Sequence, residues 1–419
     1  MALGTNISAT IFAGSLVAML ASAQPARYAL TDLGPVGPPP GQPYFITSDG
    51  LVSGAVATSD GKLHAVLWYR GLRIDIGAPG LGGLNSQAFG VNDRGQAVGE
   101  GQTSIPNGED FCGFSALGFP GSSTSCLPFI WQNGLMTKLP TLGGANGSAN
   151  LLNNRGEVVG FAETDKPQPN CPVSQFEPVI WENSGIHSLP TFPGDPDGAA
   201  FGINDNGQVV GVSGSCAPFN GNSQLYLFES HALLWEKGIA TDLGSFGGTG
   251  AFAGNHACAI NNFGQVVGHS DATGDATTYA FLWTRESGMQ NLKTLPGDFG
   301  SLALGINDRG EVVGSSFGLN FFFRAFLWQN GKMTDLNSLI PANSPLYLQL
   351  AESINSDGDI VGLGQTPSGE VHGFLAIPRD SESDRERVFS PASQTEAGAM
   401  APSESAREML LRRLGIRRR

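Results

Sequence analysis

Carboxylates that stand outside any repeating pattern are the residues of this chain best suited to acid–base chemistry. They are Glu109, Asp110, Glu163, Asp165, Asp195 and Asp197. Two carboxylates held at a fixed separation can cleave a glycosidic bond, because one protonates the leaving group while the other acts as base or nucleophile. Asp110, Asp165 and Asp195 are therefore the candidate catalytic residues of a polysaccharide-acting hydrolase or lyase. The alternative is that all six are solvated loop acids, since no spacing shows that they converge.

Four of the five cysteines lie in irregular insertions and are candidates for disulfide bonds. Four cysteines permit three pairings, and the sequence alone does not choose between them. We favour Cys112 with Cys126, because they share one loop, and Cys171 with Cys216, because they occupy equivalent loops of adjacent units. Free thiols at all four positions are the alternative. Two disulfides would fit an oxidising compartment.

Histidines and repeated acids offer no metal site. Three histidines recur at one repeat position, where a ring would keep them apart: His64, His231 and His372. Asp93, Asp205 and Asp308 lack the alternating ligands and terminal Glu of a calcium loop, so we expect them to cap turns. No nucleophile elbow, Walker loop or dinucleotide fingerprint is present. The sequence therefore predicts no metal and no cofactor.

The elements that must position these residues repeat seven times. Each copy holds a turn with two glycines four residues apart, as in residues 203–211, Ile-Asn-Asp-Asn-Gly-Gln-Val-Val-Gly. Asn, Asp and Gly at these spacings are typical of a tight hairpin, because short polar side chains bond the local backbone and Gly adopts positive φ. The copies begin near residues 46, 91, 152, 203, 260, 306 and 354.

Each unit predicts four strands, and the spacing of the units is typical of propeller blades. The seventh unit stops after three strands, at Ile377, and lacks the strand that carries Asp-Leu-Gly. A matching strand lies at the other end of the chain, where Thr31–Gly34 reads like Thr241–Gly244. Pairing it into the last unit closes a ring without an exposed edge. The sequence therefore predicts an all-β fold, a seven-bladed β-propeller of four-stranded blades spanning residues 24–378.

Large and small side chains follow the same repeat. All six tryptophans end the predicted third strand, where diverging blades leave space to fill: Trp68, Trp131, Trp181, Trp235, Trp283 and Trp328. The seventh unit has Ala376 there, so we expect irregular packing at the closure. Alanines recur on the predicted innermost strand, where blades converge. Cys258 falls where other units place Phe89 or Phe201, which predicts a small buried hydrophobe.

These motifs resemble the repeats of the bacterial HAF-repeat proteins. Over residues 27–378 the units read Ile/Val-Asn-x-x-Gly-x-Val-Val-Gly, then His/Tyr/Arg-Ala-Phe/Leu-Leu-Trp, then Asp-Leu-Gly-x-x-Gly-Gly. No unit carries the literal His-Ala-Phe tripeptide of the family, and the nearest copies begin at His64, His231, Tyr279 and Arg324. The resemblance implies export and a propeller-like array, with no defined activity.

Both ends of the chain differ from the repeats. Residues 1–23 carry no charged side chain and end in Ala-Ser-Ala, which predicts a signal peptide cleaved before Gln24. An uncleaved anchor is the alternative, and no later stretch is long enough to span a bilayer. Residues 379–419, rich in Ser, Glu and Arg, predict a disordered tail with a short basic amphipathic segment at its C-terminal end. That segment could contact an anionic surface or remain unstructured.

Composition limits the partners. The net charge is −14, and the basic C-terminal residues leave the repeats more acidic still. An acidic surface repels nucleic-acid phosphates, so we expect no nucleic-acid partner. We predict a monomer that is secreted, periplasmic or held at the cell surface, with no integral membrane span once the signal is removed.

The long insertions of the repeat predict a binding face. They fall at residues 101–127, 162–177 and 212–230, between the second and third strands of blades 2, 3 and 4. Loops held by a rigid scaffold commonly carry function. The predicted function is an exported binding or scaffold module for an unknown glycan, protein or envelope ligand, with the polysaccharide-acting enzyme as the alternative. Loops without a role are the remaining interpretation.

Overall fold

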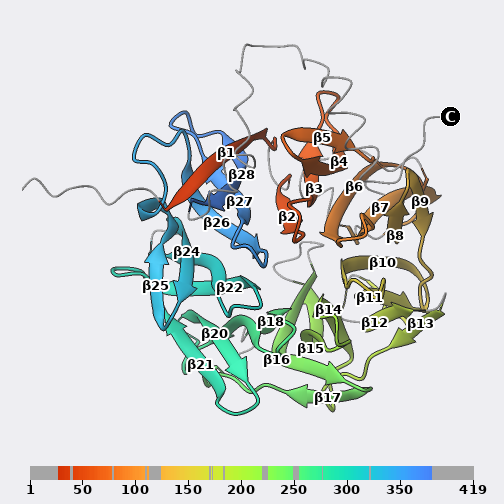
Figure 1. The fold of residues 1–419 in the computed structure, drawn as a ribbon. Coiled ribbons are helices and arrows are strands. Elements are labelled where there is room, and N and C mark those ends of the chain that lie inside the picture. The colour runs from red at the N-terminus through yellow and green to blue at the C-terminus, as the bar shows by residue number, and fades with distance from the viewer. Residues whose placement is uncertain are drawn as a thin grey trace, which may run out of the picture.

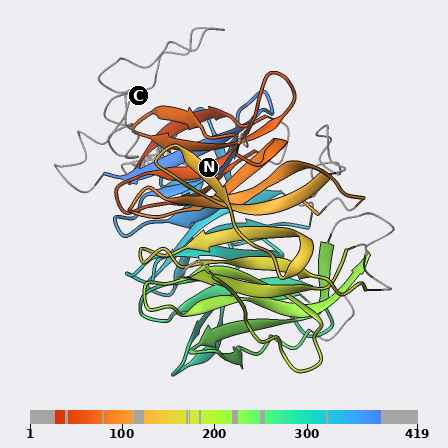
Figure 2. The ribbon, with the colours of Figure 1, turned by 90° about the vertical axis from the view of Figure 1, so that its right-hand side faces the viewer.

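Seven antiparallel sheets of four strands stand in a ring, which confirms the predicted β-propeller (Figure 1). The computed structural model describes residues 27–379 except 38–40, 78–79, 109–110, 113–123, 169–170, 172, 183–184, 219–224, 249–253, 276 and 320–321. The expected signal peptide and C-terminal tail lie outside the described residues. Figure 2 shows the blades edge-on, stacked face to face.

The strands of each blade follow one another outward from the central axis. Blade 1 consists of β2 (Pro43–Ile46), β3 (Val52–Ala57), β4 (Leu63–Tyr69) and β5 (Leu72–Asp75). Blade 2 consists of β6 (Gly82–Val91), β7 (Ala97–Pro106), β8 (Thr124–Gln132) and β9 (Leu135–Lys138). Blade 3 consists of β10 (Gly143–Leu152), β11 (Val158–Thr164), β12 (Phe176–Glu182) and β13 (Gly185–Ser188). Blade 4 consists of β14 (Asp197–Ile203), β15 (Val209–Pro218), β16 (Leu225–Glu236) and β17 (Ile239–Asp242). Blade 5 consists of β18 (Asn255–Ile260), β19 (Val266–Asp271), β20 (Thr278–Thr284) and β21 (Gly288–Lys293). Blade 6 consists of β22 (Gly300–Ile306), β23 (Val312–Phe317), β24 (Phe323–Gln329) and β25 (Lys332–Asp335).

Blade 7 is assembled from both ends of the repeat region, as the sequence predicted. Its order is β26 (Tyr347–Ile354), β27 (Ile360–Gln365), β28 (Val371–Pro378) and then β1 (Tyr28–Pro35). Strand β1 lies antiparallel to β28, with Leu30 opposite Ala376 (Figure 1). A short 3₁₀ helix, η1 (Leu336–Ser338), precedes the blade. The N-terminal strand therefore completes the last blade to four strands, so β28 is paired on both sides.

The two glycines of each turn are required for different structural reasons, as blade 4 shows. Gly207 has a φ of 79°, which L residues with a side chain rarely adopt. Gly211 lies where a Cβ would overlap the carbonyl oxygen of Ala199 on the neighbouring inner strand. One glycine thus permits the turn, and the other lets the first two strands approach closely.

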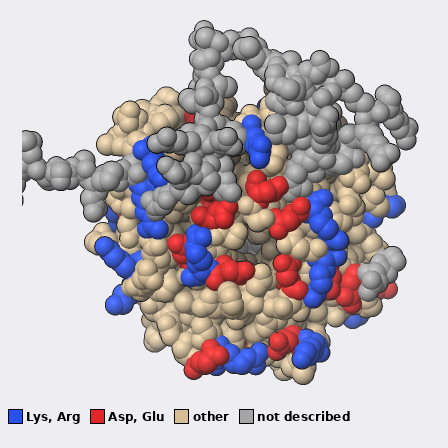
Figure 3. All heavy atoms as spheres, in the orientation of Figure 1, with Lys and Arg blue, Asp and Glu red and all other residues tan. Residues whose placement is uncertain are grey.

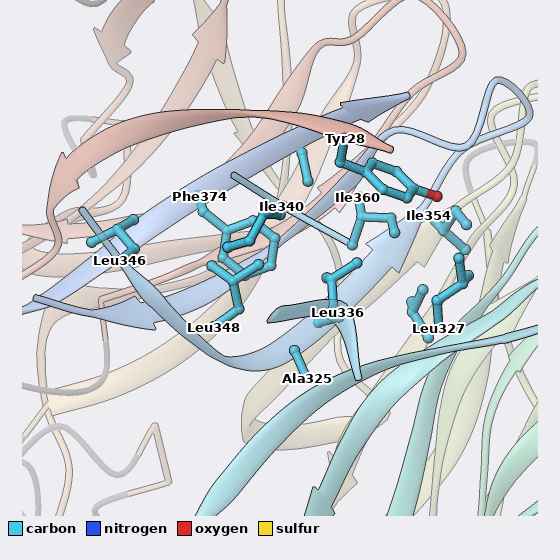
Figure 4. Close-up of a cluster of buried hydrophobic side chains, with 13 residues drawn as sticks. Tyr28, Ala325, Leu327, Leu336, Ile340, Leu346, Leu348, Ile354, Ile360 and Phe374 are labelled. Atoms are coloured by element: carbon cyan, nitrogen blue, oxygen red, sulfur yellow. The ribbon is translucent and has the colours of Figure 1, made fainter. Parts of the chain in front are cut away.

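Tryptophans fill the seams between blades, with one exception at the closure. Trp131 of blade 2, for example, packs against Leu67 of blade 1 and is 3% exposed. In the seam between blades 6 and 7 the small Ala376 takes that place, and Tyr28 from β1 packs there with Leu336 (Figure 4). Tyr28 is 1% exposed. The N-terminal strand therefore supplies an aromatic side chain as well as main-chain pairing to this seam.

A ring of buried asparagines joins the inner ends of the blades. In blade 4, Asn204 Oδ1 accepts from the backbone N–H of Asn206 and Gln208, at 3.0 and 2.9 Å. Its Nδ2 donates across the seam to the carbonyl oxygen of Asn261, at 2.9 Å. The same cross-seam bond is made by Asn92, Asn153, Asn261, Asn307 and Asn355. Each amide thus fixes its own turn and holds the next blade.

Replacing Asn204 with Ala should lower the free energy of unfolding by about 2 to 4 kcal/mol, because buried backbone groups on two blades lose their partner. The measurement is urea and thermal unfolding. Asn206→Ala is the matched control, since this neighbour donates only to the exposed carbonyl of Asn262. We expect it to cost about 1 kcal/mol or less. Equal losses for the two variants would contradict the role of the ring.

Deleting residues 24–34 should destabilise the protein by several kcal/mol, because β28 loses one of its two paired strands and the last seam loses Tyr28. Differential scanning calorimetry gives the change, which should appear as a melting temperature lower by on the order of 10 °C. An unchanged melting temperature would refute closure by this strand.

Candidate functional site

The innermost strands enclose a central channel that widens into a chamber of about 410 Å³. One repeat position, three residues before the turn asparagine, supplies a side chain from every blade. These side chains are Tyr44, Phe89, Asn150, Phe201, Cys258, Leu304 and Glu352. Equivalent positions on a ring converge only at its axis, so the channel is where seven different side chains meet.

Glu352 is the one carboxylate at this position, and it breaks the repeat. Gln42 donates to its Oε1 at 3.0 Å. The side chain faces the chamber and is surrounded by protein, so burial raises the pKa of the Glu352 carboxyl to about 7, against the lowering effect of the Gln42 hydrogen bond. This carboxyl therefore exchanges its proton near neutral pH, as groups at functional sites commonly do.

Aromatic rings lie beside this carboxyl. Tyr44 meets Phe89 edge to face, with ring centroids 5.0 Å apart. Its hydroxyl donates to Gln87 Oε1 at 2.6 Å, and burial raises the pKa of Tyr44 well above its usual value. On the other side of the channel Phe201 stacks on His256 at 6.1 Å. The chamber therefore combines one ionisable carboxyl with several aromatic surfaces.

The sequence predicted a small buried hydrophobe at Cys258, and its side chain lines the chamber wall and is half-buried. The reason is its position on the inner strand, where no further strand covers it. Its Sγ is 3.7 Å from His269 Nδ1. Burial raises the pKa of Cys258 to about 12 and lowers the pKa of His269 to about 3 and that of His256 to about 4. All three groups are therefore neutral at pH 7, and a neutral thiol is a poor nucleophile.

The channel opens on the face that carries the Asn-Gly turns. Its outer end, which we call the mouth, is a cavity of about 300 Å³. Asp93, Asp205 and Asp308 line it, and Figure 3 shows carboxylates gathered around the central hollow. These aspartates do not cap their own turns as predicted. Asp205 instead accepts from the backbone N–H of Asn154 in the preceding blade, at 2.8 Å, because the asparagine before each aspartate already caps the turn.

The opposite face carries the predicted insertions, and both predicted disulfides are present: Cys112 with Cys126, and Cys171 with Cys216. Strands β7, β8, β15 and β16 extend into the segments expected to be loops, so Cys126 and Cys216 lie on strands. Phe111 packs on Phe161 at 5.4 Å, within a small core that also holds the disulfides. This packing joins segments of blades 2, 3 and 4.

The candidate catalytic carboxylates are not brought together by any contact that the structure describes. Asp110 lies outside the described residues, and Asp165 is exposed. Asp195 accepts from Ser213 Oγ at 2.6 Å and pairs with His231 Nδ1 at 2.9 Å. The catalytic role of these three residues stays a prediction.

The other unrepeated acids hold strands together. Asp197 accepts from the backbone N–H of Phe176 and of Cys216, at 3.1 Å each. Glu163 is buried and accepts from Asn146 Nδ2 at 2.7 Å. Glu109 lies outside the described residues. Both described acids thus satisfy buried donors instead of facing solvent.

The three repeated histidines each lie beside a different aspartate. His64 pairs with Asp75 at 2.7 Å, His231 with Asp195, and His372 with Asp32 at 2.9 Å. Within the described part of the chain, one cluster has metal-ligand proximity: Glu100, Cys112 and Cys126. Its two sulfurs form a disulfide and offer no thiolate, so the cluster does not suit a metal.

A group of partly exposed aromatic side chains at the seam between blades 6 and 7 was not identified from the sequence. We call it the aromatic platform: Phe299, Phe317, Phe322, Phe323 and Tyr347. Phe322 lies 5.2 Å from Tyr347, and Phe317 lies 5.6 Å from Phe323, between ring centroids. Four phenylalanines within residues 317–323 were the available signal. The platform follows β23, so it lies on the same face as the disulfide-bonded segments.

No helix among the described residues is long and apolar enough to cross a membrane. By its strand pairing the chain is a seven-bladed β-propeller protein. No protein-family model and no curated protein sequence matches it.

Several solved structures resemble the chain at low similarity. AofleA from Arthrobotrys oligospora is 10% identical with a TM-score of 0.36, over 74% of this chain and 89% of that one. Trypanosoma rangeli sialidase is 9% identical with a TM-score of 0.37, over 80% and 54%. A mutant Aleuria aurantia lectin in complex with Fucα1-6GlcNAc is 10% identical with a TM-score of 0.36, over 88% and 100%. Similarity this low carries no inference about ligand or activity.

The proton of Glu352 gives a testable pH dependence. Below its ordinary pKa of 4.5 the carboxyl is protonated in both folded and unfolded chains. As pH rises to about 7 the unfolded chain loses the proton while the folded chain keeps it, so the free energy of unfolding falls. Glu352→Gln should therefore gain stability over the parent between these pH values, reaching on the order of 2 kcal/mol at pH 8.

The measurement is urea unfolding of parent and variant at pH 4.5, 6 and 8. Glu286→Gln, at an exposed turn of blade 5, is the charge-matched control and should track the parent. A Glu352→Gln variant whose stability relative to the parent is the same at all three values would show that this carboxyl ionises normally.

Proposed function

We propose that this protein is an exported binding module that recognises a glycan on the face carrying the aromatic platform and the disulfide-bonded segments of blades 2 to 4. The observation that carries the proposal is the platform. Phe299, Phe322 and Phe323 are 38%, 48% and 36% exposed, and the neighbouring Leu319 is 77% exposed. Clustered exposed apolar surface of this kind marks an interaction site.

The chemistry of the platform suits sugars. One face of a pyranose ring presents C–H groups, which pack on aromatic rings, while its edge presents hydroxyls that need hydrogen-bond partners. Polar groups flank the platform: Arg324, directly after Phe323, pairs with Asp298 at 2.9 Å and with Asp335 at 3.5 Å. These charged groups provide donors and acceptors beside the aromatic rings.

Rigidity supports the same assignment. The platform extends from paired strands: the Phe299 N–H donates to the Phe317 carbonyl at 2.8 Å, and the Gly318 N–H donates to the Phe322 carbonyl at 3.2 Å. Across the ring, two disulfides hold the segments of blades 2 to 4. A preformed surface binds without a large cost in conformational entropy. Disulfides also suit an oxidising compartment, which supports export.

Replacing Phe322 or Phe323 with Ala should weaken glycan binding about threefold to tenfold each, since an aromatic contact contributes roughly 0.5 to 1.5 kcal/mol. A glycan array identifies the ligand, and titration calorimetry measures the variants. Phe263→Ala is the matched control: Phe263 is 75% exposed but lies in an Asn-Gly turn on the opposite face. Equal binding by all three variants, or no glycan bound by the parent, would overturn the proposal.

A further inference from the structure

We propose that the central chamber is a second binding site, for an organic ammonium ion carried on an apolar body. This site is independent of the glycan surface, because it opens through the mouth on the opposite face. The chamber is about 410 Å³, within the range of small-molecule sites. Its walls, its charge and its entrance each favour this class of ligand.

The walls favour an apolar body. Mouth and chamber share a ring of side chains that stands between them, so a ligand that passes from the mouth to the chamber contacts this ring. The shared residues are Phe45, Leu151, Ile203, Ile260, Ile306 and Ile354. All six are hydrophobic, and contact with them would remove apolar ligand surface from water.

The charge favours a cation. Among the described residues that line the chamber, Glu352 is the only ionisable carboxyl, and none is Lys or Arg. Gln42 donates to one carboxylate oxygen and orients the group. A half-buried carboxylate without a positive partner is destabilised by its partial desolvation, whereas an ammonium ion beside it would offset that cost. The aromatic faces of Tyr44, Phe89 and Phe201 add cation–π attraction for the same ligand.

The entrance favours the same charge. Asp93, Asp205 and Asp308 surround the mouth, and the whole chain carries a net charge of −14. Carboxylates around a narrow opening raise the local concentration of cations and repel anions. The carboxylates at the mouth and the carboxyl of Glu352 in the chamber therefore favour the same charge of ligand.

Among the described side chains that line the chamber, Glu352 is the group that changes charge between pH 5 and pH 8.5; the nearby Glu100 carboxylate lies outside this lining and accepts from Gln87. Tyr44 and Cys258, which face Glu352, stay protonated because burial raises both pKa values, and His256 and His269 stay neutral because burial lowers theirs. Glu352 ionises within this interval. Affinity for a permanent cation should therefore rise with pH, and the change reports on this carboxyl.

The probe is benzyltrimethylammonium, whose charge does not depend on pH. Titration calorimetry of the full protein should show binding at pH 8.5 that weakens at least tenfold at pH 5. Glu352→Gln should bind weakly at both pH values, while Glu286→Gln, which changes the net charge equally outside the channel, should match the parent. The unfolding measurements on Glu352→Gln show whether that variant is folded.

Alkylation of Cys258 tests whether the probe binds in the chamber. Cys258 lines the chamber and is the free cysteine of the described chain; because its thiol is neutral it reacts slowly, so alkylation by N-ethylmaleimide is followed over hours at pH 8.5, and bound probe should slow it further. Absence of binding up to 10 mM probe, equal affinity of the Glu352→Gln variant, or unchanged alkylation in the presence of bound probe would each overturn the proposal. None of these outcomes bears on the platform, which is tested by Phe322 and Phe323.

Discussion

The buried asparagine that joins each blade to the next is the interaction on which the rest of this structure depends. Each blade is a separate sheet, and apolar packing between sheets is non-directional. The asparagine amide adds direction: Asn153, for example, accepts from its own turn and donates to the carbonyl of Asn204 in the next blade, at 3.1 Å. This bond sets the height of one turn against the next, and so it aligns the inner strands that enclose the channel. In blade 1, Thr47 replaces the asparagine and bonds to Leu51 within its own turn.

This alignment separates the two faces of the molecule by chemical role. On the turn face, every blade contributes the same short hairpin, so equivalent side chains of the seven blades form a ring. The blades differ in the side chains that they present to the channel at the axis of this ring. On the opposite face, the segments between second and third strands differ from blade to blade, so blades 2 to 4 carry disulfides and the seam between blades 6 and 7 carries the aromatic platform. The regular scaffold thus carries one site at the axis, where all seven blades meet, and one surface on the opposite face that is spread over several blades.

Sequence reasoning succeeded where a structural rule repeats. Paired glycines, tryptophans and the orphan strand at residues 27–34 identified the ring and its closure, because each must satisfy the same local geometry in every blade. It also identified both disulfides, one from two cysteines in a single loop and the other from equivalent loops of adjacent units. It missed Glu352, because one acid on a strand carries no motif. The convergence of position 352 with Tyr44 and Cys258 exists only across the ring.

The sequence by itself determined the blades, their number and the strand that closes them, since turn chemistry and side-chain volume are local properties that repeat along the chain. Tertiary structure decided the environment of individual groups. Burial in the channel moves the proton affinity of Glu352 and of the histidines, and the seam at Ala376 is filled by Tyr28 from the other end of the chain. Desolvation and packing depend on what surrounds a side chain in space, and a ring brings together residues that are hundreds of positions apart.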